Sequence, residues 1–195
     1  MNQKIYTPVL AVTILFCLNF ISLNVFSQFE QKFTINGSVT YVYPDMFEDA
    51  SDYGNGLGFD GGLQYNFNRN LSFYGAFRFY YMFGGAYEDA YYDNIALGGG
   101  LKLNLLPAKK INPYLFAEAD LNFIWLEEYL YEIDSYSSES GLSIGSLGGL
   151  GFDFVINDNL ALFVQSGSYY TYWDNRLNLY SQLGVRINMI KSKTI

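Results

Sequence analysis

Apolar and polar residues alternate along most of this chain. From residue 33 onward, large apolar side chains recur at every second position, with small, polar or charged residues between them. A period of two is typical of β-strands whose two faces meet different surroundings. The alternation is interrupted seven times, which predicts eight strands. The eight runs span residues 33–43, 57–66, 71–83, 95–105, 115–125, 142–156, 160–170 and 179–189.

The connections between these runs alternate in length. Three are short and contain Asn, Pro or Lys: residues 66–70, 106–112 and 157–159. Four are longer and rich in acidic residues and Tyr: residues 44–56, 84–94, 127–141 and 171–178. Short turns at one end and long loops at the other are the layout of outer-membrane barrels. Since no helical crossover separates the runs, we expect an antiparallel up-and-down sheet.

The two faces of the predicted strands differ in a way that indicates which one meets lipid. One face is bulky and apolar in all eight runs, whereas the other mixes Gly, Ser and Asn with a few charges. A water-facing sheet would carry many more Lys and Glu than this second face does. Many runs also reach the roughly 9–11 residues that a tilted strand needs to cross a bilayer. We therefore predict an all-β fold, an eight-stranded antiparallel transmembrane β-barrel with its apolar face toward lipid. The alternative is a soluble barrel that encloses the apolar face.

The composition supports an exported membrane protein and excludes several other classes. Apolar residues make up 50% of the chain and aromatic residues 19%, while charged residues make up only 15%, against about 25% in typical soluble domains. The net charge of −8 argues against nucleic acid as a partner. The chain has no His, which removes the usual general base and the commonest metal ligand. We expect no cofactor, no metal site and no enzymatic activity.

The first 27 residues have the features of a secretory signal peptide. Lys4 supplies a positive charge, an apolar run follows, and Ser27 is a small residue suited to precede a cleavage site. We expect residues 1–27 to be removed and residues 28–195 to form the barrel domain. The alternatives are an uncleaved anchor helix and, because the single Cys17 lies in the apolar run, a lipoprotein.

Seven charged residues fall on the face that the barrel would enclose. They are Asp60, Arg78, Lys102, Glu118, Asp120, Asp153 and Arg186. An eight-stranded lumen is just wide enough to be filled by side chains, and isolated buried charges cost several kcal/mol each. We therefore interpret them as an ion-pair network that plugs the lumen. Alternatives are a gated pore through this network and a catalytic pair formed by Glu118 and Asp120.

Aromatic and acidic residues gather near the predicted strand ends. An interfacial girdle of aromatic side chains is expected from Tyr41, Tyr43, Tyr81, Phe83, Trp125, Tyr170 and Tyr172. Most of the 19 acidic residues lie in the long connections. They are interleaved there with tyrosines that offer contact area at low entropic cost: Tyr87, Tyr91, Tyr92, Tyr129, Tyr131 and Tyr136. One interpretation of these loops is a solvated surface whose like charges repel each other. The alternative is that they bind an extracellular surface or a protein ligand, or bridge divalent cations beside lipopolysaccharide.

The strand pattern resembles the small eight-stranded outer-membrane barrels of the OmpX/OmpA-like class, over about residues 32–190. The last run is similar to the C-terminal assembly signal of that class, through Gln182, Gly184, Ile187 and Met189. Met189 stands where the class usually has an aromatic residue, and residues 190–195 follow it. The resemblance implies the outer membrane of a Gram-negative bacterium as the location. Its implied partners are outer-membrane lipid, lipopolysaccharide and the barrel-assembly machinery.

These observations give the architecture more sharply than the activity. The leading hypothesis is a non-enzymatic outer-membrane barrel with a structural or adhesive role through its acidic, Tyr-rich loops. The alternatives are a narrow, porin-like channel, an accessory barrel of a secretion system, a lipid-modifying barrel enzyme and a soluble ligand-binding barrel.

Overall fold

The computed structural model describes residues 32–43, 55–83, 91–107, 109–130, 135–172 and 176–189. The signal-peptide prediction for residues 1–27 lies outside these residues. Eight strands follow one another without a helix between them in the described part. Their bounds are β1 Lys32–Tyr43, β2 Asn55–Asn66, β3 Leu71–Phe83, β4 Tyr91–Asn104, β5 Ile111–Leu130, β6 Ser135–Asn157, β7 Leu160–Thr171 and β8 Arg176–Asn188. No described segment forms an apolar helix of membrane-spanning length.

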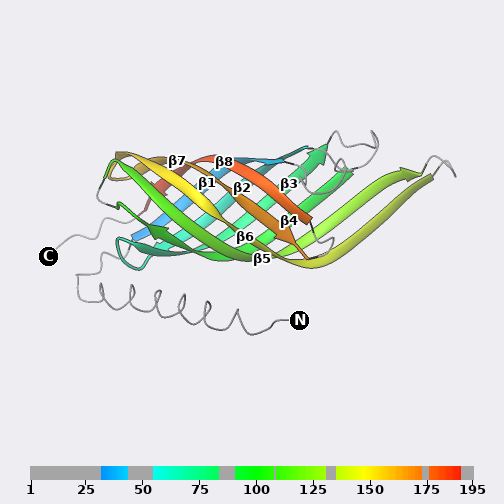
Figure 1. The fold of residues 1–195 in the computed structure, drawn as a ribbon, viewed down its shortest axis with the longest axis horizontal. Helices are drawn as coiled ribbons and strands as arrows, with labels where there is room; N and C mark the ends of the chain where they lie inside the picture. Colours follow the sequence, from blue (N-terminus) through cyan, green and yellow to red (C-terminus); the bar gives the residue numbers. More distant parts are fainter. Residues whose placement is uncertain are drawn as a thin grey trace, which may run out of the picture. The chain divides into compact units, whose positions relative to one another are not determined.

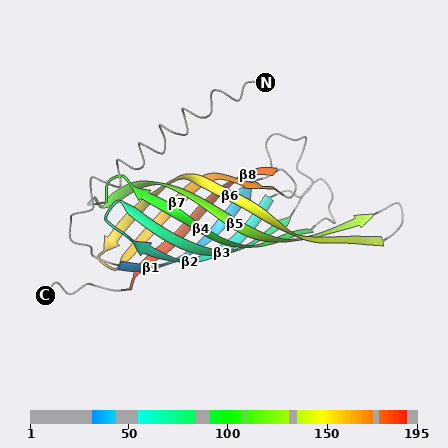
Figure 2. The same cartoon turned by 90° about the horizontal axis from the view of Figure 1, so that it is seen from below.

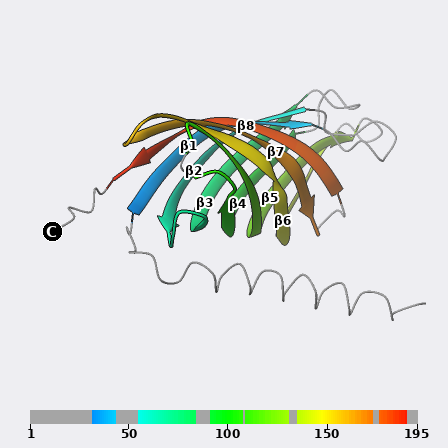
Figure 3. The ribbon, with the colours of Figure 1, turned by 60° about the vertical axis from the view of Figure 1, so that its left-hand side comes forward.

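The strands form a closed barrel in which each pairs antiparallel with its neighbours in sequence (Figure 1). Strand β1 closes the barrel by pairing with β8, from Thr34 opposite Asn188 to Tyr43 opposite Leu179. Closure gives every strand of the wall a partner on both sides, which a sheet surrounded by hydrocarbon requires. The strands are inclined to the barrel axis and curve around it (Figures 2 and 3). The predicted eight-stranded antiparallel barrel is confirmed.

The alternation in the sequence becomes the two surfaces of the barrel wall. Large apolar side chains project outward from every strand, among them Phe59, Leu97 and Leu183, which are 65%, 52% and 67% exposed. The residues between them point inward and are mostly buried. In a water-soluble barrel this apolar set would be inside. The structure therefore excludes the alternative of a soluble barrel with an apolar cavity, because its apolar stripe covers the exterior.

The strand bounds differ most from the sequence-based ones at the long-loop end of the barrel. Strands β5 and β6 contain 20 and 23 residues, whereas the other six contain 12 to 14. Residues 127–130 and 135–141, expected to lie in a long loop, instead extend β5 and β6 as paired strands. The prediction was wrong because this segment has few large apolar residues, and cross-strand pairing rather than a buried face holds it in strand conformation.

Candidate functional site

The centre of the lumen holds a cluster of three carboxylates around one guanidinium. Arg78 on β3 makes a two-pronged contact with the carboxylate of Glu118 on β5. Its Nε lies 2.8 Å from Asp60 Oδ1, and its Nη1 lies 3.5 Å from Asp120 Oδ2. Thr40 donates a hydrogen bond to Asp60. This cluster, defined by these four charged residues and called the acidic cluster below, carries two more negative than positive charges.

A second cluster lies closer to the short turns and has the opposite excess. The carboxylate of Asp153 on β6 contacts both Lys102 Nζ, at 2.5 Å, and the guanidinium of Arg186. The ring of Tyr114 packs beneath both cations, with Lys102 Nζ at 4.1 Å and Arg186 Cζ at 4.8 Å from its centroid. Arg186 also lies 3.9 Å from the Phe163 ring centroid. Cation–π contacts of this kind stabilise a desolvated positive charge, which helps this cationic cluster to tolerate burial.

The structure thus brings the seven predicted lumen charges into two groups. A polar cavity of about 50 Å³ has Asp60 and Arg78 of one group and Lys102 and Arg186 of the other among its lining residues. Such a volume has room for a few water molecules. The Arg78–Glu118 and Lys102–Asp153 contacts are buried. The candidate pair Glu118 and Asp120 is engaged by Arg78 and less than a tenth exposed.

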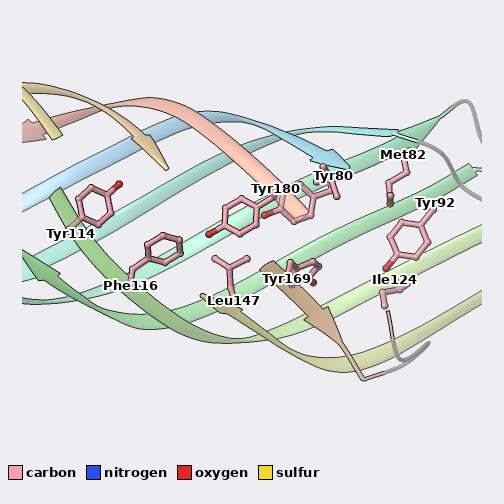
Figure 4. Packing of buried hydrophobic residues seen from close by; sticks show 10 residues of the cluster. Tyr80, Met82, Tyr92, Tyr114, Phe116, Ile124, Leu147, Tyr169 and Tyr180 are labelled. Carbon is pink, nitrogen blue, oxygen red and sulfur yellow. The ribbon is translucent and has the colours of Figure 1, made fainter. Parts of the chain in front are cut away.

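Aromatic and aliphatic side chains fill much of the remaining lumen (Figure 4). Tyr114 and Phe116 lie near the short-turn end, with ring centroids 6.1 Å apart, and Tyr180 lies 6.3 Å beyond Phe116. Tyr80 and Tyr169 follow, at 6.0 Å from each other. Val42, Met82, Tyr92 and Ile124 are also buried members of this group. Side chains therefore fill most of the cross-section that an open channel would need.

The sequence pattern identified the seven charged residues of the lumen but did not single out Tyr114, Phe116, Leu147 or Tyr180. All four are buried, and Tyr114 and Tyr180 are 0% exposed. Their inward position could have been predicted from the period-two alternation, because each lies an even number of residues from a polar residue that faces the lumen. Tyr114 and Phe116 share a strand face with Glu118, and Tyr180 shares one with Gln182. Their large apolar character hid their inward position.

A third polar group lies near the long-loop end. Asn94 donates hydrogen bonds to Asn122 and to the Tyr169 hydroxyl, each 3.0 Å long. Asn122 donates in turn to Asp120 Oδ1 at 3.0 Å. These two amide side chains connect Asp120 of the acidic cluster to the Tyr169 hydroxyl, toward the long-loop end. Asn94 Oδ1 accepts no hydrogen bond from the described residues, so the network leaves one buried acceptor unsatisfied.

The four residues of the candidate assembly signal lie on β8 or directly after it. Gln182 and Gly184 face the lumen and are buried, while Ile187 and Met189 face outward with 51% and 57% exposure. They therefore present an alternating pattern on one strand. Their role in recognition by the assembly machinery stays a prediction.

The aromatic girdle can be followed where side chains are described. Tyr43, Tyr81, Trp125 and Tyr172 are 43%, 36%, 44% and 59% exposed, and all lie near strand ends away from the short turns. The ring of Tyr41 lies 4.8 Å from that of Tyr43, and Tyr170 lies 4.8 Å from Tyr172. This places amphipathic rings at one boundary of the apolar belt, where a membrane interface would lie.

The hairpin formed by β5 and β6 projects beyond the rest of the wall (Figures 1 and 2). Strand β4 accompanies β5 only as far as Glu127, and β7 accompanies β6 only from Gly145. Between Ser135 and Ile144, β6 therefore has no described strand on its outer side. The segment 127–141 carries five acidic residues and no Lys or Arg. The projecting hairpin thus combines negative charge with a strand edge that pairs with no described strand.

The predicted acidic and Tyr-rich loop surface is only partly described. Tyr92, expected to contact a partner, instead points into the lumen and is 8% exposed. It lies on β4, and the alternation there places it on the inner face. Tyr91, Tyr129 and Tyr136 also lie in strands, whereas Tyr87 and Tyr131 lie outside the described residues.

Comparisons with solved structures identify the same fold. Neisserial surface protein A is 16% identical over 81% of this chain and 97% of that one, with a TM-score of 0.59. OprG from Pseudomonas aeruginosa is 14% identical over 83% and 97%, with a TM-score of 0.58. Ail, the attachment invasion locus protein of Yersinia pestis, is 17% identical over 82% and 97%, with a TM-score of 0.51.

The sequence matches no protein-family model and no curated protein. The closed barrel and its apolar exterior are nevertheless both features expected of a protein in the outer membrane, the predicted location. The chain has the architecture of the small eight-stranded barrels of bacterial outer membranes.

Proposed function

We propose that this outer-membrane barrel is non-enzymatic and has a structural or adhesive role, exerted through the acidic surface at its long-loop end. The projecting β5–β6 hairpin is the observation that carries the proposal. A closed barrel needs no strand longer than its wall. Here β5 nevertheless continues past its pairing with β4, and β6 extends beyond its pairing with β7. An exposed strand edge can accept a further strand from a partner.

The contents of the lumen support a role outside it. Ion pairs, amides and stacked rings occupy the positions that a substrate path would need. The carboxylates of Glu118 and Asp120 already contact Arg78, which leaves neither as a free acid or base. One structurally similar protein, Ail, is the attachment invasion locus protein of Yersinia pestis. For the present chain, attachment is a proposal supported by its own hairpin.

The backbone of the outer β6 edge indicates which groups a partner would meet. Tyr172 N donates to Ile144 O, so the backbone groups of Ile144 point toward the β7 side. The pairing of β6 with β5 is regular from Ser135 to Phe154. Because the direction of backbone groups alternates along a strand, those of Ser140 and Ser138 point to the same outer side. The local negative charge favours a cationic, extended polypeptide as the partner.

Shortening the hairpin tests the proposal. Residues 127–138 are replaced by Asn-Gly, which joins the cross-strand partners Leu126 and Glu139 through a two-residue turn; the backbone groups of Glu139 point toward β5, as such a turn requires. Cells displaying either form are then compared for adhesion to an immobilised peptide of alternating lysine and threonine. Adhesion that depends on the hairpin supports the adhesive role. Unchanged adhesion and unchanged resistance of the envelope to detergent would contradict both roles.

A substitution on the edge separates strand addition from general charge attraction. Ser140→Pro removes one outward N–H without removing a bond to β5, since proline is tolerated on edge strands when its nitrogen faces outward. Ser140→Thr retains the N–H and is the matched control. We expect the proline variant alone to lose adhesion to the peptide. If only the shortened hairpin loses adhesion, the binding is electrostatic and the edge is not its site.

A further inference from the structure

Two of the short turns carry exposed cations. The β2–β3 turn contains Arg69, and the β4–β5 turn contains Lys109 and Lys110. All three residues are exposed. Neither turn contains Asp or Glu. The opposite end of the barrel is rich in acid, so the charge is distributed unequally between the two ends.

Hydrogen bonds hold these two turns side by side. Asn104 N donates to Asn70 O at 2.6 Å, and Asn104 Nδ2 donates to Arg69 O at 3.1 Å. Asn70 Nδ2 donates back to Asn104 O at 3.0 Å. On the other side, Val155 N donates to Lys110 O at 2.8 Å. The three cations therefore extend from backbone that is fixed to the barrel wall.

Exposed apolar side chains border the same turns. Leu105, Leu106 and Ile111 are 47%, 50% and 54% exposed. They continue the outward apolar surface of the strands up to the end of the wall. The basic rim, defined as Arg69, Lys109 and Lys110, thus stands where hydrocarbon gives way to lipid headgroups.

The cations of the basic rim differ from those of the lumen in their contacts with described carboxylates. Arg78, Lys102 and Arg186 each contact at least one carboxylate. Within the described part of the chain, none of the three rim residues forms an ion pair. Three such cations beside apolar surface attract an anion that itself carries an apolar portion.

We propose that the basic rim binds the phosphodiester headgroup of an anionic phospholipid, phosphatidylglycerol, in the leaflet that faces the short turns. In outer-membrane barrels these turns face the periplasm. The flanking Leu105, Leu106 and Ile111 would contact the acyl chains, which distinguishes a lipid from free phosphate. The third short turn contains Asp158 instead of a cation, so the site occupies one side of the rim. This lipid contact is independent of any partner of the hairpin.

Competition between two lipids tests this site. The full chain is purified from outer membranes in an uncharged detergent and exposed to equimolar phosphatidylglycerol and phosphatidylcholine. Native mass spectrometry then counts the lipids bound. We expect a preference for phosphatidylglycerol that weakens with added salt. Each of Arg69→Gln, Lys109→Gln and Lys110→Gln should lower the preference about fivefold, and the triple variant should abolish it.

The matched control is Arg176→Gln, which removes one cation where β8 begins, at the opposite end of the barrel. This variant should keep the wild-type preference. Equal binding of the two lipids by the wild type would overturn the proposal, as would a preference that survives in the triple variant. Displacement of phosphatidylglycerol by equimolar glycerophosphoglycerol, which has the headgroup without acyl chains, would overturn the assignment to a lipid. Heat-dependent gel mobility verifies that each variant is folded.

Discussion

Arg78 and Glu118 meet across strand β4, directly over the backbone of Gly98. The two charged residues belong to β3 and β5, which are not neighbours in the sheet. A Cβ atom at Gly98 would lie 2.8 Å from Glu118 Cδ and 3.2 Å from Arg78 Nη1, and closer still to Glu118 Oε1. The absence of a side chain at residue 98 is therefore what allows this ion pair to bridge three strands.

Gly98→Ala should destabilise the barrel by about 1–3 kcal/mol, since the added methyl group must displace a packed and charged pair. The adjacent Gly99→Ala is the matched control. Gly99 faces outward, and the nearest atom to its Cβ would be Tyr74 O at 3.8 Å. We expect the control to be neutral or to stabilise by up to about 1 kcal/mol. Urea unfolding in phospholipid vesicles, followed by tryptophan fluorescence, measures both. Equal effects would contradict the steric role of Gly98.

Replacing Arg78 removes the single cation of the acidic cluster. Arg78→Met leaves Asp60, Glu118 and Asp120 buried together, and loss of one partner from a buried ion pair typically costs about 3–5 kcal/mol. The temperature at which the folded band disappears from an SDS gel should fall markedly. Arg69→Gln, on an exposed turn, should change stability by less than about 0.5 kcal/mol.

A second substitution identifies the source of that loss. If uncompensated charge is responsible, Arg78→Met combined with Glu118→Gln should be more stable than Arg78→Met alone. A double variant no better than the single one would instead assign the loss to packing of the arginine side chain.

The sequence contained enough information to predict the barrel but not the arrangement inside it. Period-two alternation assigns Phe59 outward and Asp60 inward without knowledge of any partner strand, and the structure agrees. The pairing of Arg78 with Glu118 depends on the register of β3, β4 and β5 together. That register is set by side-chain packing and by hydrogen bonding along whole strands, so no short motif reveals it.

The length of the β5–β6 hairpin could not be predicted from the sequence, because it too depends on cross-strand pairing. Residues such as Ser137, Ser138 and Ser140 have no strong strand preference and no apolar partner to bury. They are in strand conformation because Glu127 and Glu128 lie opposite Ser138 and Ser137 across the hairpin. The acidic, Ser-rich composition of this segment therefore indicated a loop. The structure instead shows two antiparallel strands that pair with each other.

The packed lumen predicts that the wild-type protein forms no steady ion-conducting pore in a planar lipid bilayer. Phe116→Ala combined with Tyr180→Ala removes two neighbouring rings of the lumen and should produce measurable conductance if those rings block the path. Conductance by the wild type would instead favour the channel alternative. Phe59→Ala, an outward substitution, provides the control for altered insertion.

Charge on the outer surface should be costly in proportion to its depth in the membrane. Leu183 is 67% exposed near the middle of β8, whereas Met189 is 57% exposed just beyond its end. Leu183→Arg should destabilise the barrel by about 2–4 kcal/mol and Met189→Arg by only about 0–1 kcal/mol, as arginine near the interface remains hydrated. The difference should appear in urea unfolding from phospholipid vesicles. If the two variants are equally stable, β8 does not present this face to hydrocarbon. Comparing the same variants in detergent, where arginine at either position can reach water, separates the cost of membrane depth from the cost of losing each side chain.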